Sequence, residues 1–574
     1  MDISKNALKV LEHRYLLRND DGKVIETPDK MFKRVAKAIS AADKKYKENA
    51  SKSEKEFYSL MSNLEFLPNS PTLMNAGAKN GQLAACFVLP IEDSIESIFE
   101  TLKDMAKIHQ SGGGVGYNFS KIRPKGDIIS TTKGHASGPV SFMTIFDKAT
   151  DVIKQGGKRR GANMGILNIN HPDIMEFIVS KRNEGVLKNF NISAAINEDF
   201  MKAAEEDKEI SLINPKTKKA AEKVKAKKLF NLICRTAWEC GDPGVIFIDE
   251  INRHNPLKKI GLIESTNPCG EVPLFPYESC TLGSINLSKF VKGKNVDFGK
   301  LKKAVHTAVH FLDNVIDANK YPIPEIEKIS LSNRKIGLGV MGFADMLIKL
   351  GIPYDSKHGL EIAEKIMKFI TEEAREKSEE LGKKRGSFAN FKKSELSKRY
   401  KHMRNATVTT IAPTGTLSLI ADCSSGIEPL FGVVFEKSVL NGEHLVEVNP
   451  LFLEMAKKEG FYSKTLIDEA AKKGSVKDIK SVPEKFKRIF ASAHDIGYEQ
   501  HVWMQAAFQK YTNNAVSKTV NLNNDASADD IKNVFLLAYK LKCKGITVYR
   551  EGSKREQIIN IGKSKNPKVC VECN

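Results

Sequence analysis

A short segment with a thiol, a carboxylate and an amide carries the most reactive groups of this sequence. Asn267, Cys269 and Glu271 fall within five residues, and a second thiol, Cys280, follows them. Proline and glycine flank the first cysteine, so we expect a tight loop and not the interior of a helix or strand. A loop tip can bring a sulfur and a carboxylate into one cavity, where a thiol radical takes a hydrogen while the acid moves a proton. The alternative is a buried structural cysteine beside a helix-capping glutamate.

The composition describes an ordinary globular protein with a basic surface. The 574 residues are 41% hydrophobic and 28% charged, and no apolar run reaches the roughly 18 residues that a membrane span needs. No secretory signal is visible, so a cytoplasmic location is expected. The formal charge of +20 suits nucleic acid, anionic nucleotides or a lysine-rich solvated surface. Because aromatic-interleaved basic stripes and zinc-finger spacing are absent from the sequence, we do not expect dedicated nucleic-acid binding.

The nine cysteines are better explained as reduced thiols than as a disulfide framework. An odd count in a long chain without a signal argues against secreted disulfides. Cys570 and Cys573 lie at the tip of a polar tail, and zinc would need two more ligands than the tail offers. A redox dithiol is therefore favoured for this pair. Four other cysteines are predicted to be packing residues: Cys234, Cys240, Cys423 and Cys543.

The hydrophobic pattern predicts an α/β protein. Residues 1 to 65 show helical spacing, as in Met31–Ile39 and Glu54–Leu60. Long amphipathic helices, with apolar faces at Leu301–Val315 and Leu360–Ile370, separate apolar stretches that resemble buried strands, and this alternation indicates a parallel sheet. The predicted strands are Val245–Asp249, Thr407–Ile411 and Gly545–Tyr549.

Three further segments suit the binding of a ligand. Thr410–Leu419 follows a predicted strand and opens a helix, so its backbone N–H groups and hydroxyls could bind phosphate; an ordinary capped turn is the alternative. Ser111–Tyr117 is glycine-rich and lets the backbone approach a ligand closely, although it lacks the dinucleotide-binding pattern. Lys154–Asn163 is a basic loop that either is simply exposed to solvent or responds to a bound nucleotide.

Taken together, these motifs resemble the catalytic subunit of ribonucleotide reductase, most closely the adenosylcobalamin-dependent class II enzymes. The resemblance implies an α/β fold: a ten-stranded α/β barrel of the ribonucleotide reductase and glycyl-radical enzyme type. Its two parallel five-stranded halves would surround the Cys269 loop. The expected division is an N-terminal helical region (1–65), the barrel with catalytic and effector-site loops (66–550) and a C-terminal redox tail (551–574). The stretches that carry the resemblance are Arg14–Leu16, Glu26–Pro28, Leu67–Gly77, Cys86, Asp93–Ile95, Asn267–Glu271, Pro413–Thr416, Lys544–Arg550 and the two terminal cysteines.

The resemblance also implies catalytic roles. Cys269 would become the thiyl radical that takes the 3′ hydrogen of the ribose, and Glu271 would accept the 3′-hydroxyl proton. Asn267 would hold the substrate hydroxyls. Cys86 and Cys280 would supply the two electrons and end as a disulfide, with Cys86 protonating the departing 2′-hydroxyl. The family often has serine before that first redox cysteine, and alanine stands there in this sequence.

Binding roles follow from the same resemblance. Cys570 and Cys573 would re-reduce the inner disulfide with electrons from thioredoxin or a glutaredoxin-like protein. The implied substrate-binding residues are Ser70, Ala85, Gly114, Pro413, Thr414, Gly415 and Thr416. A deoxynucleoside triphosphate or ATP effector would bind at the interface of a homodimer. The implied effector-binding residues are Asp93, Arg123, Gln155, Arg159 and Arg160.

The source of the radical is predicted by what the sequence lacks. Class I subunits carry a Tyr-Tyr pair near the last strand, where this chain has only Tyr549, and the glycine motif of the anaerobic class is absent. Adenosylcobalamin is the remaining source of the radical, and no separate metal site is expected. The sequence has no Asp-x-His-x-x-Gly motif, so we do not expect a histidine of the protein to replace the cobalamin's own base. Two alternatives stay open: a class I-type subunit that needs a radical-generating partner, and an inactive nucleotide-sensing homologue. The sequence also leaves open whether the ribonucleotide substrate is a diphosphate or a triphosphate.

Overall fold

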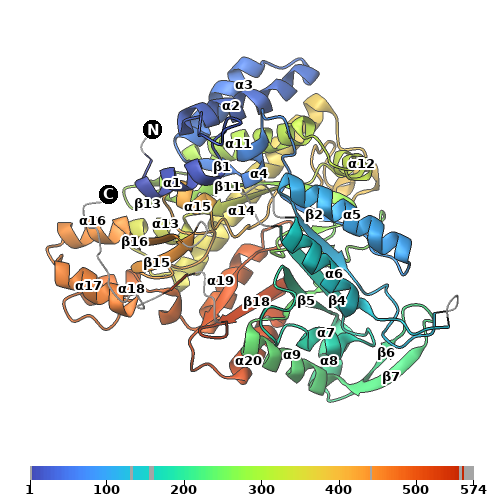
Figure 1. The fold of residues 1–574 in the computed structure, drawn as a ribbon. Helices are drawn as coiled ribbons and strands as arrows, with labels where there is room; N and C mark the ends of the chain where they lie inside the picture. The colour runs from blue at the N-terminus through green and yellow to red at the C-terminus, as the bar shows by residue number, and fades with distance from the viewer. Residues whose placement is uncertain (1–2, 130–132, 154–160, 440–442, 555–558, 561–574) are drawn as a thin grey trace.

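The computed structural model describes residues 3–129, 133–153, 161–439, 443–554 and 559–560 (Figure 1). Five residues with predicted roles lie outside these ranges: Gln155, Arg159, Arg160, Cys570 and Cys573. Within the described ranges, no helix is both long enough and apolar enough to cross a membrane.

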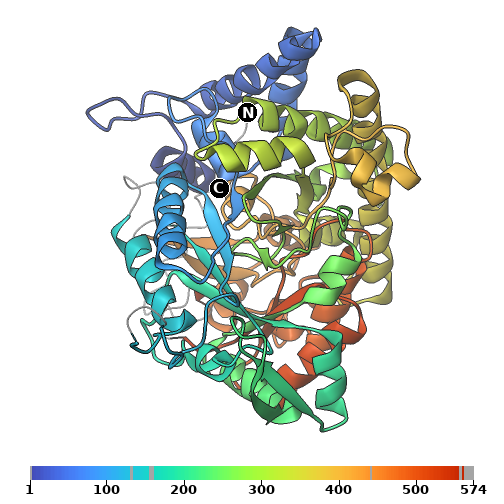
Figure 2. The ribbon, with the colours of Figure 1, turned by 90° about the vertical axis from the view of Figure 1, so that its right-hand side faces the viewer.

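The N-terminal region is helical, as predicted. It contains α1 (Lys5–Arg14), α2 (Pro28–Ser40) and α3 (Ala50–Ser62). Each begins at a residue whose side chain accepts a backbone N–H bond, which satisfies donors that a helix start leaves unpaired. The apolar faces of α2 and α3 pack on the barrel helix α11 (Phe298–Ala318), and Figures 1 and 2 show the blue helices beside it.

The first half of the barrel consists of five parallel strands. They are joined in the order in which they follow along the chain, with helices between them. Such buried parallel strands need helical crossovers, and this explains the alternation of apolar runs and amphipathic helices in the sequence. The strands are β2 (Cys86–Val88), β3 (Gly114–Asn118), β4 (Asn163–Asn168), β5 (Phe190–Ile196) and β8 (Gly244–Phe247).

The second half runs in the opposite direction. Its members are β11 (Glu278–Asn286), β14 (Ile336–Met341), the stretch 407–411, β17 (Thr519–Leu522) and β18 (Gly545–Arg550). The stretch 407–411 joins β14 through a Leu338–Thr409 bridge and leads toward β17 through an Ile411–Val516 bridge. Antiparallel pairing of β2 with β11 and of β8 with β18 connects the halves. Without the stretch 407–411, which joins only by single bridges, and with β1 (Phe66–Pro68) added beside β11, ten strands form one mixed sheet, and this confirms the predicted fold class.

Helices cover both halves, and each half has its own large apolar core. The main covering helices are α5 (Ile95–Ser111), α6 (Pro139–Val152), α9 (Ala226–Cys240), α14 (Lys357–Arg385), α19 (Tyr498–Gln509) and α20 (Ala528–Lys540). A smaller core lies under α16 (Pro450–Lys458), α17 (Lys464–Lys473) and α18 (Glu484–Ile489), near the hairpin of β15 (Val434–Val439) and β16 (Glu443–Val448).

One predicted strand has the wrong boundary. The strand expected at Val245–Asp249 ends at Phe247, and α10 (Ile248–Arg253) begins at the next residue. Asp249 and Glu250 fall in the first turn of that helix, where carboxylates interact favourably with the helix dipole. Helix α10 therefore directs the chain away from the sheet before the loop with Cys269 begins.

A buried ion-pair network joins the N-terminal region to the barrel. Asp313 on α11 bonds Arg334, Arg385 and Arg404, and Arg385 also bonds Asp43 of the N-terminal region. Burial opposes the ionisation of Asp313, but the arginines outweigh it and hold the pKa of this carboxyl well below its usual range. Removing one member would leave charges buried without compensation, so the network locks the relative position of the two regions.

Candidate active site

The loop with Cys269 is the tip of a hairpin that enters the barrel. Short strands β9 (Ser265–Thr266) and β10 (Pro273–Leu274) pair antiparallel, and Gly270 N donates to Asn267 O at 3.0 Å. Gly270 has φ +81°, a conformation that favours glycine. Val272 N also donates to Asn267 Oδ1 at 2.9 Å, so the asparagine side chain shapes the loop. Of the seven cysteines within the described ranges, Cys269 alone is exposed, as a reactive thiol must be.

Two glycines of β3 let this hairpin pass. A Cβ on Gly116 would lie 1.7 Å from Thr266 O, and one on Gly114 would lie 2.8 Å from Pro268 Cγ. Because real Cβ atoms do not approach backbone so closely, any other residue at position 116 would displace the hairpin. The close backbone approach predicted for the glycine-rich segment is therefore made to the protein's own catalytic loop.

Hydrogen bonds from both halves of the barrel fix the hairpin. Asn191 of β5 donates to Pro268 O at 2.8 Å. From the other half, the Thr410 hydroxyl and the backbone N–H of Ala515 donate to Glu271 O at 2.6 Å and 2.9 Å. Glu271 itself is 2% exposed. The loop is thus held at several points, with Glu271 buried and the Cys269 thiol accessible, as precise positioning of a reactive group requires.

The two predicted redox cysteines face each other across a strand pair. Cys86 of β2 is directly opposite Cys280 of β11 in the antiparallel register. Opposed residues in such a pair have Cα atoms about 4.5–5.5 Å apart, which is compatible with the roughly 4.4–6.8 Å range of disulfides. Both are buried, and neither is in a disulfide in this structure. Asn267 Nδ2 donates to Cys86 Sγ at 3.2 Å, so the catalytic loop contacts the pair directly.

The environment keeps Cys280 protonated. Burial raises its pKa, Lys335 opposes this effect, and the nearby Glu278 and Glu271 carboxylates add to it. A thiol that carries its hydrogen suits the role of reductant, since both a proton and an electron must leave with it.

A buried ion pair anchors the base of the hairpin. Lys335 Nζ lies 2.7 Å from Glu278 Oε2, and both side chains are essentially inaccessible. The same carboxylate oxygen accepts a bond from Phe275 N at 2.9 Å, and Glu278 Oε1 accepts one from Asn333 at 2.7 Å. Through these bonds the pair connects the end of the hairpin to the start of β14.

The predicted substrate residues surround the catalytic loop from two sides. Ser70 begins α4 (Ser70–Asn75), and its hydroxyl lies 2.8 Å from the Tyr15 hydroxyl. The Ala85 carbonyl accepts a bond from Gly114 N at 2.9 Å, so its backbone helps to join the start of β2 to β3, and its role toward the substrate stays a prediction. These residues lie near β2 and β3.

On the opposite side, the turn of Pro413–Thr416 follows the stretch 407–411 and precedes α15 (Leu417–Ile420), a helix of only four residues. Thr414 has φ +55°, and its hydroxyl accepts a bond from Gly426 N at 2.7 Å. This hydroxyl therefore shapes the turn, and phosphate binding there stays a prediction.

The described effector residues form an ion pair. Arg123 Nε lies 2.8 Å from Asp93 Oδ2, and Arg123 N donates to Asp93 Oδ1 at 3.1 Å. Asp93 comes just before α5, whose first turn is capped by Ser94. The structure thus brings the two residues together at one end of that helix, and their effector role stays a prediction.

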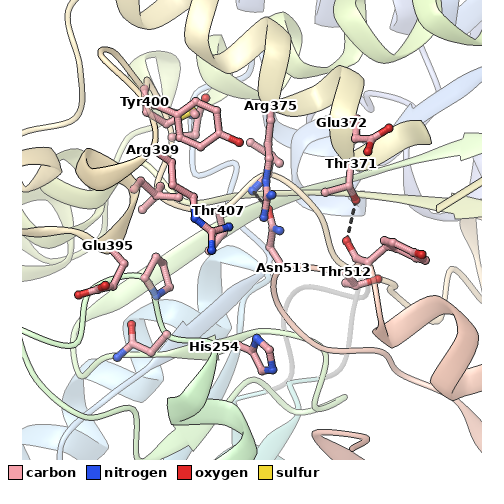
Figure 3. A pocket seen from close by; sticks show the side chains of 18 of the residues that line it. His254, Thr371, Glu372, Arg375, Glu395, Arg399, Tyr400, Thr407, Thr512 and Asn513 are labelled. Carbon is pink, nitrogen blue, oxygen red and sulfur yellow. Dashed lines mark hydrogen bonds between the residues drawn. The ribbon is translucent and has the colours of Figure 1, made fainter. Parts of the chain in front are cut away.

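A basic cavity that the sequence patterns did not reveal lies beside the start of 407–411 and residues 510–513, which follow α19. It measures about 490 Å³ and is lined by residues that include His254, Arg375, Arg399, Thr407 and Asn513 (Figure 3). These residues come from separate segments of the chain, so no local spacing marks them. The runs of Lys and Arg in those segments were the only sequence signal.

Comparisons with known proteins agree with this geometry. The family description "Ribonucleotide reductase, all-alpha domain" matches residues 1–81, and "Ribonucleotide reductase, barrel domain" matches residues 84–403 and 399–549. The chain therefore belongs to the ribonucleotide reductase family.

Individual relatives are similar over nearly the whole chain. A vitamin B12-dependent ribonucleoside-diphosphate reductase of Thermoplasma acidophilum is 52% identical over 99% of this chain and 81% of its own. The protein of the same name from Mycobacterium tuberculosis (strain ATCC 25618 / H37Rv) is 46% identical over 98% of this chain and 80% of its own. The solved class Id ribonucleotide reductase alpha subunit of Actinobacillus ureae shares the fold, with a TM-score of 0.77 at 23% identity, covering 96% of this chain and 99% of that one.

Proposed function

We propose that this chain is an adenosylcobalamin-dependent ribonucleoside-diphosphate reductase that converts ribonucleotides to 2′-deoxyribonucleotides, the precursors of DNA. The observation that carries the proposal is the juxtaposition of three thiols: an exposed Cys269 on a loop whose Asn267 contacts Cys86, with Cys280 opposite Cys86. The names of the relatives from Thermoplasma acidophilum and Mycobacterium tuberculosis support the cofactor and the diphosphate substrate.

Each step of the proposed ribonucleotide reduction is assigned to a residue of the chain. Cys269, as a thiyl radical, takes the 3′ hydrogen of the ribose, and Glu271 accepts the proton of the 3′-hydroxyl. Cys86 gives its proton to the 2′-hydroxyl, which leaves as water. The thiols of Cys86 and Cys280 supply the two electrons of the reduction and join as a disulfide. The proton of Cys280 adds at C2′, and Glu271 returns its proton to the 3′ oxygen. Cys269 then returns its hydrogen to C3′, so it is regenerated as a radical.

The basic cavity beside the start of 407–411 and residues 510–513 measures about 490 Å³, so it would enclose only part of the cofactor. When bound, adenosylcobalamin supplies the unpaired electron through homolysis of its cobalt–carbon bond. The group presents peripheral amides and a phosphodiester. The cavity offers matching donors and acceptors from Arg375, Arg399, Thr407 and Asn513. The role of the chain is to hold the group within reach of Cys269 and to exclude water from the loop.

The proposal also covers the re-reduction of the inner disulfide and the regulation of activity by an effector nucleotide. The N-terminal helices (1–65) and the barrel (66–550) would be followed by a tail (551–574) that carries Cys570 and Cys573 to the inner disulfide, with thioredoxin or a glutaredoxin-like protein as donor. A deoxynucleoside triphosphate or ATP effector would bind near Asp93 and Arg123.

A homodimer and a cytoplasmic location belong to the same proposal. Exposed apolar side chains gather on two neighbouring helices, where a second copy could cover them. They are Ile95 and Phe99 on α5 and Ile145 and Val152 on α6.

The test is an activity assay with purified protein, CDP, dithiothreitol and adenosylcobalamin, with and without deoxynucleotides. We expect dCDP only when the cobalamin is present, and faster turnover of CDP than of CTP. Product that requires a second protein and no cobalamin would indicate a class I-type subunit. Nucleotide binding without any product would indicate an inactive sensing homologue.

A further inference from the structure

A fully buried lysine lies directly before β17. The side chain of Lys518 is inaccessible to solvent, and its Nζ donates to His501 Nδ1 at 2.9 Å and to Thr519 O at 3.2 Å. Its third bond is an ion pair with the carboxylate of Glu428. These three bonds use all the N–H groups of the ammonium, so Lys518 has no donor left for a ligand.

The surroundings of Lys518 make Glu428 its only counter-charge among these partners. His501 Nε2 donates to Ala493 O at 3.0 Å, so its Nδ1 accepts from the ammonium as a neutral imidazole does. Burial and the charge of Lys518 lower the pKa of His501. Burial also lowers the pKa of Lys518, and Glu428 opposes this shift. Glu428 therefore stabilises the buried charge.

Glu428 in turn fastens the segment 425–428 to β17. Its second carboxylate oxygen, Oε1, accepts a bond from Thr519 N at 2.8 Å, so both oxygens bind the start of this strand. A second buried side chain holds the same segment, because the Tyr354 hydroxyl donates to Ile427 O at 2.7 Å. The segment is thus fixed by side chains from two distant parts of the chain.

The segment 425–428 lies directly behind the turn of Pro413–Thr416. Gly426 N donates to the Thr414 hydroxyl at 2.7 Å, and a Cβ on Gly426 would lie 3.1 Å from Ala412 O. Thr414 has φ +55°, which is unfavourable for a residue with a side chain. The conformation of the turn therefore depends on this contact with the segment behind it.

The front of the turn is fixed to the same part of the chain. Ile411, at the end of the stretch 407–411, forms a parallel bridge with Val516 and accepts a bond from Ser517 N at 2.9 Å. Lys518 follows at the next position. Residues 516–519 thus hold the chain that enters the turn by backbone pairing, and the segment behind the turn by the ion pair with Glu428.

We propose that Glu428, held by Lys518, is a positioning residue that fixes the turn of Pro413–Thr416 in the shape that receives the phosphates of the ribonucleotide substrate. The inference rests on the proposed function, which supplies the phosphate-bearing substrate. In this role neither side chain touches the phosphate. A turn that is already ordered binds its ligand without the entropic cost of ordering it first.

The test compares the wild type with Glu428→Gln by calorimetric titration of CDP and of inorganic pyrophosphate. The glutamine keeps the size of the side chain but leaves the Lys518 charge without a partner. Loss of positioning should weaken the binding of both ligands about 10-fold. An uncompensated ammonium acting by charge alone would attract phosphate and strengthen binding, so tighter binding would overturn the proposal.

Steady-state kinetics give a second readout. The KM for CDP should rise about 10-fold while kcat stays within about 3-fold, because the lost contact serves the ground state and the transition state alike. A fall in kcat at unchanged KM would show that Glu428 acts on the chemical step and not on the turn. Glu428→Asp keeps the charge on a shorter side chain, and a smaller rise in KM is expected for it even if the glutamine variant is unstable.

Control variants test whether Glu428 acts through the turn. Glu373→Gln breaks a partly buried ion pair with Lys302 between α14 and α11 and should leave both affinities unchanged. Thr414→Val removes the acceptor for Gly426 N and should weaken binding as Glu428→Gln does, whereas Thr414→Ser keeps the hydroxyl. The valine and glutamine changes together should weaken binding no further than either alone. Additive losses would show that Glu428 acts elsewhere.

Hydrogen exchange of the ligand-free protein measures the positioning by itself. Peptides that contain Gly426 should exchange faster in Glu428→Gln than in the wild type, and peptides from α11 should not. Unchanged exchange, or faster exchange with unchanged pyrophosphate binding, would refute the proposal. If the wild type binds no CDP, the proposed function fails, while exchange and pyrophosphate binding still decide whether Glu428 positions an anion-binding turn.

Discussion

The two parallel halves of the barrel meet at two antiparallel strand pairs, here called seams, and the side chains that face each other differ between them. In the β2–β11 seam, Cys86 is opposite Cys280. In the β8–β18 seam, Val245 is opposite Ile546, and both belong to the apolar core. The backbone geometry is the same kind of antiparallel pairing in both cases. One seam therefore places two thiols at the short cross-strand distance, and the other places two apolar side chains there.

The second seam has its own unusual group in Lys544. Its backbone carbonyl bonds Phe247 N across the seam, and its Nζ donates to the carbonyls of Asn513 and Asn514 at 2.7 Å and 2.5 Å. Burial lowers the pKa of this amine to about 7, although the Glu250 carboxylate opposes the shift. Since Asn513 lines the basic cavity, this seam supports the cavity wall. The difference teaches that a pair of facing thiols and a support for the basic cavity can occupy separate seams of one barrel.

Replacing the thiol between the seams should have the largest effect. Cys269→Ser should lower deoxynucleotide formation by at least about 10³-fold, because a hydroxyl O–H bond is too strong to replace a thiol in radical transfer. Binding of CDP and of cobalamin, measured by dialysis, should stay within about 3-fold of the parent because the loop keeps its hydrogen bonds. Turnover of the serine variant near the parent rate would contradict the assignment.

The comparison of the seams can be tested directly with cysteines. Cys280→Ser should abolish multiple turnover because the second electron donor is missing. Adding Val245→Cys and Ile546→Cys to this variant places a matched pair in the other seam. That pair should form a disulfide under oxidation, detected by mass spectrometry, and should not restore activity. Restored turnover would show that the location of the dithiol is unimportant.

The buried ion pair at the base of the hairpin should dominate local stability on the thiol side. Glu278→Gln leaves the Lys335 ammonium buried beside a neutral amide, and we expect a loss of about 3–5 kcal/mol in the free energy of unfolding. Urea denaturation at pH 7 measures the loss. Lys302→Gln breaks ion pairs that are partly exposed between α11 and α14, and the loss should be much smaller because water screens such pairs. Equal losses in the two variants would argue against an anchoring role.

The most gradual effect is a pH dependence of stability from the second seam. Lys544 has a folded pKa of about 7, below its unfolded value of about 10.4. Between these values the unfolded state binds more protons, so this residue makes stability rise with pH by up to about 1.4 kcal/mol per unit. Its contribution is lowest below pH 7, where the buried amine is charged, and levels off above about 10.4.

Urea denaturation between pH 7 and 10 should therefore show a shallower rise for Lys544→Met than for the parent. Lys540→Met, at the exposed end of α20, is the matched control and should keep the parental slope. Identical slopes in all three proteins would show that the amine is not buried in neutral form.

The sequence by itself determined the local features. Proline and glycine around Cys269 predicted a tight loop, and hydrophobic periodicity located α2, α3, α11 and α14 and the strand β18, because these signals act over a few residues. It misplaced the end of β8, where an apolar residue, Ile248, begins a helix. The stretch 407–411 has the apolar character of a strand but joins its neighbours only by single bridges.

Only the tertiary structure decided how distant segments meet. The register that places Cys86 opposite Cys280, the approach of Gly116 to Thr266, and the meeting of Arg375 with Arg399 in one cavity all join residues from separate segments. A strand's own sequence favours one face for burial but does not name its partner or its alignment, since pairing energy arises from contacts across the sheet. The reactive residues could therefore be found in the sequence, while the distances that let them act together depend on the closed barrel.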